Sequence, residues 1–289
     1  MPFTTSDALP TLVGAELMAL LNEAKYLLSA LRAEYPHLSH LFDQPFQQRA
    51  AFAIPQLCTE ISYHSVSGHF MNAAQRRHTM QYAMVCLATG AGDDLVDMPV
   101  PAFRERMNLA CTSVIFGNSA YTYLIRHHDE RLDSLVTAAL DEMLNRLTTA
   151  GCSEIEYNDT TAFDVTSYLR LARQKTTSYT IPAFSLGAGL SGATSDQHHH
   201  LREIGLRIGT VLQLIDDLLD APHDYQSNRG SCSYPAALAL RRESLQPISD
   251  LIEGELKHGL LSSSTLPHPA YLNSVFHSIR DNLSVLGSL

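Results

Sequence analysis

The sequence predicts an all-α protein. In seven segments apolar residues recur at intervals of three and four, which places them on one side of a helix. No stretch alternates between apolar and polar residues over a length that would indicate a β-strand. The chain has 289 residues, 45% of them hydrophobic, which is enough for one large core. We therefore expect a single domain over residues 1–289, built as a bundle of roughly ten or more helices.

The periodic segments follow one another along the chain and are separated by Gly, Pro and polar residues. They are residues 12–31, 80–87, 107–125, 132–147, 165–172, 201–219 and 271–286, with a further helix of small residues at 181–192. Helix breaks are predicted at Pro36, Pro45, residues 90–92, Pro99, Pro101, Gly151, residues 191–200 and residues 221–233.

Composition excludes several classes of protein. Thirty acidic against 20 basic residues give a formal charge of −10, which argues against a nucleic-acid-binding surface. No segment has the length and apolar character of a signal peptide or a membrane span. The cysteines stand singly and form no CxxC pair, so they indicate neither a zinc site nor a disulfide framework, and reduced thiols fit a cytoplasmic protein. They are Cys58, Cys86, Cys111, Cys152 and Cys232.

The pattern Asp-Asp-x-x-Asp occurs twice. On a helix, residues i, i+1 and i+4 lie on one side, so each copy offers a compact set of carboxylate oxygens, which Mg²⁺ prefers as ligands. The second copy interrupts an apolar run, and both copies lie near predicted helix C-termini, where the helix dipole disfavours negative charge unless a cation is bound. We predict that the two motifs bind metal with a diphosphate between them. Their residues are Asp93, Asp94, Asp97, Asp216, Asp217 and Asp220.

Four other candidate ligand-binding residues stand between the two motifs in the sequence. Lys175 and Thr176 precede the helix of small residues, where a lysine can contact a phosphate oxygen and small side chains leave room for a bulky apolar ligand. Gln213 lies about one helical turn before Asp216 and can hydrogen-bond a ligand. Arg104, which follows the first motif, is a candidate anion-binding residue.

These residues in combination resemble the trans-isoprenyl diphosphate synthase (polyprenyl synthetase) family of the class I isoprenoid and terpene synthase superfamily. The resemblance rests on the two acidic motifs, Tyr168 followed by Lys175-Thr176, Gly187-Ala188-Gly189, and the helix that carries Gln213. It implies an isoprenoid-synthase helical bundle around a deep central cavity, with three Mg²⁺ and an allylic prenyl diphosphate held between the two motifs. Lys175 and Thr176 would contact the diphosphate, and Gln213 would stand near the carbocation. The expected assembly is a homodimer.

The N-terminal half departs from the family pattern. Where the family has Gly-Gly-Lys-Arg-x-Arg-Pro for isopentenyl diphosphate, residues 47–52 keep only Arg49 of three basic residues, and Ser231 replaces a lysine further on. Each lost charge-assisted hydrogen bond is worth about 1.5–3 kcal/mol. An enzyme without this second site can still ionise an allylic diphosphate. The favoured prediction is therefore terpene cyclisation with release of diphosphate.

Three alternatives stay open. Arginines can rebuild the second site and permit chain elongation to farnesyl or geranylgeranyl diphosphate, or a non-isoprenoid molecule can accept the prenyl group. A non-catalytic partner subunit of a prenyl synthase is the third. Small residues at Ala88 and Thr89, just before the first motif, favour a C15–C20 chain. The arginines available for elongation are Arg49, Arg76, Arg77, Arg104 and Arg106.

Overall fold

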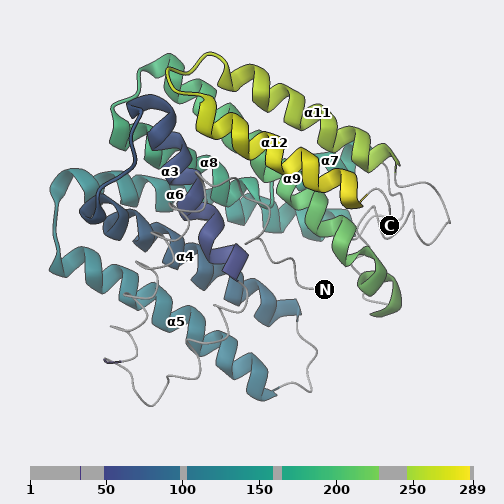
Figure 1. Cartoon of the computed structure of the whole chain (residues 1–289). Helices are drawn as coiled ribbons and strands as arrows, with labels where there is room; N and C mark the ends of the chain where they lie inside the picture. Colours follow the sequence, from purple (N-terminus) through teal and green to yellow (C-terminus); the bar gives the residue numbers. More distant parts are fainter. Residues whose placement is uncertain (1–32, 34–48, 98–102, 159–164, 228–245, 287–289) are drawn as a thin grey trace.

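The computed structural model describes residue 33 and residues 49–97, 103–158, 165–227 and 246–286. Near several helix ends, including residues 93–97, 103–105 and 219–227, it describes the backbone alone. The described ranges hold nine α-helices and no strand. The all-α helical bundle predicted from the periodicity is confirmed (Figure 1).

Six of the seven periodic segments lie inside observed helices, and the seventh, residues 12–31, lies outside the described residues. Two helices, α3 and α11, had not been predicted. The helices are α3 (Arg49–Ser67), α4 (Ala73–Asp97), α5 (Phe103–Arg126), α6 (Glu130–Asn158), α7 (Val165–Ala172), α8 (Thr177–Ser191), α9 (Ser195–Ser227), α11 (Gln246–Ser263) and α12 (Ala270–Leu286).

Several predicted helix breaks are wrong. Helix α4 continues through Gly90 and Gly92, and α6 continues through Gly151. Helix α9 begins at Ser195, within the predicted polar turn, and runs past Pro222 to its end at Ser227. A helical glycine costs only about 1 kcal/mol relative to alanine, which packing of a long helix against its neighbours outweighs. A proline removes one backbone hydrogen bond and can bend a helix without ending it.

Helix α8 runs through the middle of the bundle, and its small residues permit close contact with α3. A Cβ atom on Gly187 would lie 2.3 Å from the carbonyl oxygen of Thr59 and 2.7 Å from Cβ of Ser62. The Ser62 hydroxyl donates a 2.6 Å hydrogen bond to the carbonyl oxygen of Phe184. The prediction that these small residues leave room for an apolar ligand is therefore wrong at Gly187, because the backbone of α3 occupies that space.

The contact between α8 and α9 is equally close. A Cβ on Gly209 would lie 2.3 Å from Oγ1 of Thr180, and one on Gly205 would lie 3.1 Å from the Thr180 carbonyl oxygen. The Thr180 hydroxyl donates a 2.7 Å hydrogen bond to the carbonyl oxygen of Gly205. These contacts fix α9, and with it the second acidic motif, against the helix that follows Lys175.

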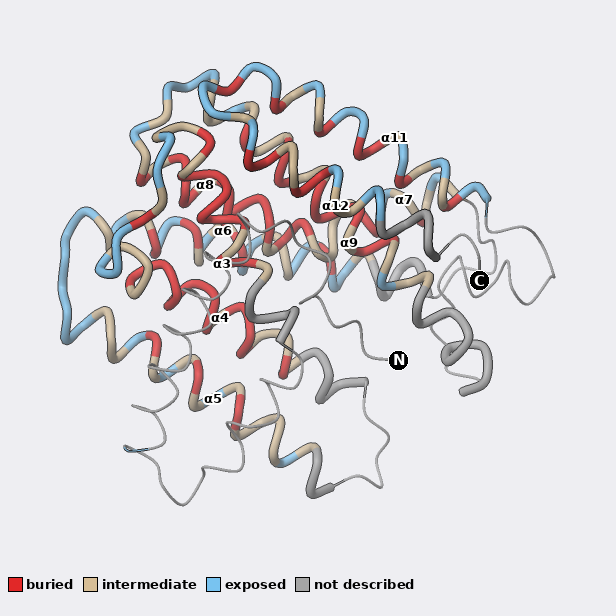
Figure 2. Tube along the Cα trace, in the orientation of Figure 1, coloured by how far each residue is buried: buried red, intermediate tan, exposed pale blue. Residues whose placement is uncertain are grey.

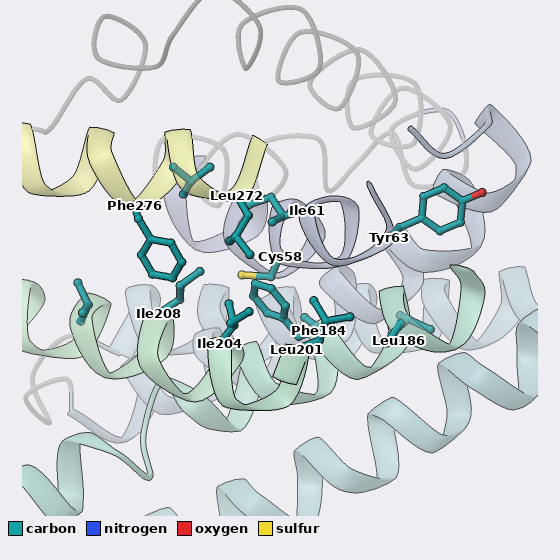
Figure 3. Packing of buried hydrophobic residues seen from close by; sticks show 14 of the residues in the cluster. Cys58, Ile61, Tyr63, Phe184, Leu186, Leu201, Ile204, Ile208, Leu272 and Phe276 are labelled. Carbon is teal, nitrogen blue, oxygen red and sulfur yellow. The ribbon is translucent and has the colours of Figure 1, made fainter. Parts of the chain in front are cut away.

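The main core lies where α3, α8, α9 and α12 meet. Cys58 and Ile61 of α3 pack with Phe184, Ile204 and side chains of α12 in Figure 3. Buried residues line the inner faces of these helices in Figure 2, while α11 and α5 present exposed outer faces. Within the described ranges, no helix is both long enough and apolar enough to cross a membrane.

Candidate active site

The two acidic motifs lie toward the C-terminal ends of α4 and α9, as the sequence predicts. Helix α4 ends at Asp97 itself, whereas α9 continues from Asp220 to Ser227. Both C-terminal ends are found at the same end of the bundle in Figure 1. The side chains of Asp93, Asp94, Asp97 and Asp220 lie outside the described residues. The metal site and the cavity between the motifs therefore remain predictions.

A chain of side-chain hydrogen bonds joins the second motif to α7 and to the start of α8. The Thr176 hydroxyl donates to Oε1 of Gln213 at 2.6 Å. Nε2 of Gln213 donates to Oδ1 of Asp217 at 2.9 Å, and the Tyr168 hydroxyl donates to Oδ2 of Asp217 at 2.6 Å. The structure thus brings three of the predicted site residues into one network and adds Tyr168, to which sequence analysis had assigned no role beyond the family resemblance.

The two described carboxylates of this motif differ in their surroundings. Asp216 is exposed, while Asp217 is half-buried and accepts a hydrogen bond on each oxygen. An ionised carboxylate oxygen has two lone pairs, so it can accept a hydrogen bond and also bind a cation. Among residues with described side chains, no group of three His, Cys, Asp or Glu gathers to hold a metal. The oxygen donors of Asp216 and Asp217 nevertheless suit a hard cation such as Mg²⁺.

Lys175 lies in a short turn that links α7 to α8. The Lys175 amide donates to the carbonyl oxygen of Leu171 at 3.1 Å, and the amide of Ser178 donates to the carbonyl oxygen of Lys175 at 3.0 Å. The turn is thus held at both ends by helix-like hydrogen bonds. Lys175 is half-buried, and Thr176 is the residue immediately before α8. The hydrogen bond from Thr176 to Gln213 ties this turn to α9.

A buried carboxylate behind the turn connects it to two further helices. Glu255 of α11 is 4% exposed and lies between two arginines. Its oxygens accept hydrogen bonds from Arg173 of the turn at 2.5 Å and from Arg207 of α9 at 2.8 Å. Nothing in the sequence pattern had singled out Glu255, because a glutamate in an amphipathic helix is ordinarily exposed.

The two small residues before the first motif lie on different sides of α4. Ala88 is buried in a small core with Phe116 of α5. Thr89 lies near α8, where its hydroxyl is 3.5 Å from the hydroxyl of Tyr179. Tyr82 is fully buried and donates a 2.7 Å hydrogen bond to the Tyr179 carbonyl oxygen. Of the two small residues, Thr89 is therefore the one that lies beside α8.

The predicted arginines are only partly described. Arg49 is the first residue of α3 and Arg104 the second residue of α5, and both side chains lie outside the described residues. Nε of Arg76 donates to the fully buried carboxylate of Glu60 at 2.6 Å. Arg76 thus compensates a buried charge, which makes it a poor candidate for the second diphosphate.

Two thiols and one hydroxyl buried in the core are held in their neutral forms. Burial raises the pKa of the Cys58 thiol to about 12. Burial likewise raises the pKa of Cys86, partly offset by its hydrogen bond with Tyr82, and raises the pKa of the Tyr82 hydroxyl. Neither thiol is a nucleophile near neutral pH, since a thiolate is the reactive form.

Sequence similarity identifies the family to which this helical bundle belongs. The sequence model of the polyprenyl synthetase family matches residues 102–255, more than half of the chain. The protein belongs to the polyprenyl synthetase family, which confirms the resemblance seen in its motifs.

Individual relatives are distant. A prenyl transferase from Synechocystis is 26% identical over 271 residues, which cover 87% of this chain and 80% of that protein. A nonaprenyl diphosphate synthase from Mycobacterium tuberculosis is 27% identical over 144 residues, covering 47% of this chain and 42% of that protein. The crystal structure of geranylgeranyl pyrophosphate synthase from Lactobacillus brevis, complexed with citrate, has a TM-score of 0.70 at 16% identity, covering 93% of this chain and 96% of that one. This last likeness concerns the fold alone.

The relatives of this protein bear on which of its predicted functions is favoured. The sequence relatives are named as a prenyl transferase and a prenyl diphosphate synthase, which favours the chain-elongation alternative. Nothing in them supports the favoured prediction of terpene cyclisation. That prediction had rested on the missing basic residues near Arg49, a feature that did not outweigh the similarity of the rest of the chain.

Proposed function

We propose that this protein is a chain-elongating prenyl diphosphate synthase, which joins an allylic prenyl diphosphate of C15–C20 class to isopentenyl diphosphate. The observation that carries the proposal is the network from Thr176 through Gln213 to Asp217, because it joins a predicted diphosphate contact to a predicted metal ligand. The names of the two sequence relatives support elongation as the outcome.

Each residue of the network would have a separate role in binding metal or diphosphate. Asp216 and Asp217, with the first motif, would hold Mg²⁺, which when bound would neutralise the diphosphate and make it a better leaving group. Lys175 would contact a phosphate oxygen from the opposite side. Both ends of the Gln213 amide are engaged, so Gln213 would orient Asp217 and Thr176 with respect to each other. The apolar chain of the substrate would extend between α4 and α8, beside Thr89.

Elongation needs a second anion site for isopentenyl diphosphate. Arg49 is the first residue of α3 and Arg104 the second residue of α5, and we propose that their side chains supply positive charge for this substrate. The weaker basic character of residues 47–52, compared with the family pattern, predicts a high KM for isopentenyl diphosphate.

The outer face of α5 is the proposed interface of a homodimer. Met107, Val114, Tyr121 and Ile125 recur on it at intervals of seven, seven and four, and each is between 47% and 68% exposed. Such spacing makes one continuous apolar stripe along a helix. In Figure 1 α5 lies at an outer edge of the bundle, packed on α4. Two copies related by a twofold axis would bury this stripe against itself.

The direct test is incubation with geranyl, farnesyl or geranylgeranyl diphosphate and Mg²⁺, each with and without isopentenyl diphosphate. We expect longer diphosphates that form only when isopentenyl diphosphate is present. Hydrocarbon or alcohol products formed without it would contradict elongation and indicate a cyclase. Absence of turnover, together with absence of Mg²⁺-dependent diphosphate binding, would refute the enzymatic function.

Substitution in each acidic motif tests the metal site. We expect Asp93→Ala and Asp216→Ala to abolish turnover while leaving the helical circular dichroism spectrum unchanged, because each removes a predicted metal ligand and Asp216 is exposed. An unchanged rate in either variant would remove that motif from the mechanism.

A further inference from the structure

The Tyr168 side chain lies in the core, and its hydroxyl contacts the carboxylate of Asp217 in the second motif. Its side chain is 2% exposed and packs in α7 beside Leu171 and Ala172. The hydroxyl oxygen lies 2.6 Å from Oδ2 of Asp217 on α9. Packing alone would be served by a phenylalanine, because burying a hydroxyl costs free energy unless it finds an acceptor. The acceptor here is a carboxylate, which makes the bond charge-assisted.

The two donors to Asp217 act on different oxygens. Tyr168 donates to Oδ2 and Gln213 donates to Oδ1, from different helices. A carboxylate held at both oxygens cannot rotate about its terminal bond, and a carboxylate oxygen that accepts a hydrogen bond can still bind a cation. Asp216, the next residue, is exposed. The pair therefore combines one oriented carboxylate and one exposed carboxylate.

We propose that Tyr168 is a positioning residue for Asp217, whose hydroxyl fixes the carboxylate in the orientation that binds the metal. This inference rests on the proposed function, since it takes Asp217 to be a Mg²⁺ ligand. Hydrogen bonds from outside a metal's ligand set hold the ligands in place, and their removal typically lowers metal affinity about 10- to 100-fold. Because Gln213 still holds the other oxygen, we expect the lower part of that range for Tyr168.

The test compares two Tyr→Phe variants. Tyr168→Phe removes the hydroxyl that donates to Asp217, and Tyr82→Phe removes a hydroxyl that donates to the Tyr179 carbonyl oxygen instead. Both rings are almost fully buried, so each variant loses one buried hydrogen bond and keeps similar packing. The difference between them isolates the effect on the acidic motif from the general cost of removing a buried hydroxyl.

Mn²⁺ binding in the presence of inorganic pyrophosphate, followed by electron paramagnetic resonance, gives a readout independent of turnover. We expect Tyr168→Phe to weaken Mn²⁺ binding about tenfold and to raise the Mg²⁺ concentration for half-maximal turnover by a similar factor, with kcat recovered at saturating Mg²⁺. Tyr82→Phe should bind Mn²⁺ as the unmodified protein does, even where its melting temperature falls. In a double-mutant cycle, Tyr168→Phe should have little further effect once Asp217→Asn is present.

Two results would overturn the role of Tyr168 and leave the proposed function standing. The Mn²⁺ affinity could be unchanged in Tyr168→Phe, or it could fall equally in Tyr168→Phe and Tyr82→Phe. If the unmodified protein binds no Mn²⁺ with pyrophosphate, the proposed metal site fails and the inference fails with it.

Discussion

Nη2 of Arg173 lies 2.5 Å from Oε1 of Glu255, a contact that joins the turn carrying Lys175 to helix α11. The other oxygen of Glu255 accepts a 2.8 Å hydrogen bond from Arg207 on α9. The carboxylate is buried, so solvent screens these interactions little. One side chain of α11 thus ties together the two segments that supply Lys175 and Asp217.

We predict that Glu255→Gln raises the KM for the allylic diphosphate several-fold. The amide keeps the shape of the side chain but removes the charge that holds two guanidinium groups, so the Lys175 turn should lose its fixed position relative to α9. Breaking a buried pair from one side typically costs about 3–5 kcal/mol, and we expect the lower part of that range because the amide oxygen still accepts. Thermal unfolding and steady-state kinetics well below the melting temperature measure the two effects.

Glu142 offers a matched control for this variant. It too accepts hydrogen bonds from two arginines, Arg202 at 2.6 Å and Arg146 at 2.7 Å, but it lies on α6, away from the Lys175 turn. Glu142→Gln should lower stability without altering KM. Equal changes of KM in both variants would show that Glu255 acts through stability alone.

The stabilising contribution of Glu142 should be lost in acid. Burial acts to raise the pKa of Glu142, but hydrogen bonds from Arg202 and Arg146 outweigh it and hold the pKa below its usual value of 4.5. A carboxyl with a lowered folded-state pKa stabilises the fold above the unfolded pKa, and this contribution is lost as pH falls through the folded pKa. The difference in melting temperature between Glu142→Gln and the unmodified protein should therefore be constant near pH 7 and shrink below about pH 4.5. A difference independent of pH would contradict this.

Arginine variants at two helix starts test the second substrate site. We expect Arg49→Ala and Arg104→Ala each to raise the KM for isopentenyl diphosphate about tenfold or more, because each removes a charge-assisted hydrogen bond worth about 1.5–3 kcal/mol. The KM for the allylic diphosphate should change little. Arg131→Ala, on α6, is a control outside the proposed site and should leave both values unchanged. Parallel increases for both substrates would argue against a specific role.

Charged residues introduced into the apolar stripe on α5 should dissociate the proposed dimer. Val114→Glu combined with Tyr121→Glu places two carboxylates in the proposed interface, where each would be buried without a partner. Sedimentation velocity should show a dimer for the unmodified protein and a monomer for the variant. Leu261→Glu, an equally exposed apolar position on α11, should leave the dimer intact. A monomeric unmodified protein would refute the assignment.

Local sequence determined the helical class and much of the candidate site. Periodicity predicted α7 with its observed bounds, because its short apolar stripe needs no information from elsewhere in the chain. The spacing within Asp-Asp-x-x-Asp placed each set of carboxylates on one helix, and the family resemblance named the pair Lys175-Thr176 as a diphosphate contact. Proline and glycine were poorer guides to the helix ends. Helices α4 and α6 continue through glycines that were predicted as breaks, and α9 continues through Pro222.

Only the tertiary structure decided which side chains meet. Three features depend on contacts between segments far apart in the sequence. The α3 backbone packs against Gly187, and Tyr168 donates a hydrogen bond to Asp217. Glu255 lies between Arg173 and Arg207. A one-dimensional pattern reports the spacing of residues along a single helix, because that spacing is set by backbone geometry alone. The partner of a buried polar group is set instead by how whole helices pack, so Asp217 could be named as a candidate ligand from the sequence, whereas its hydrogen bond from Tyr168 could not be predicted.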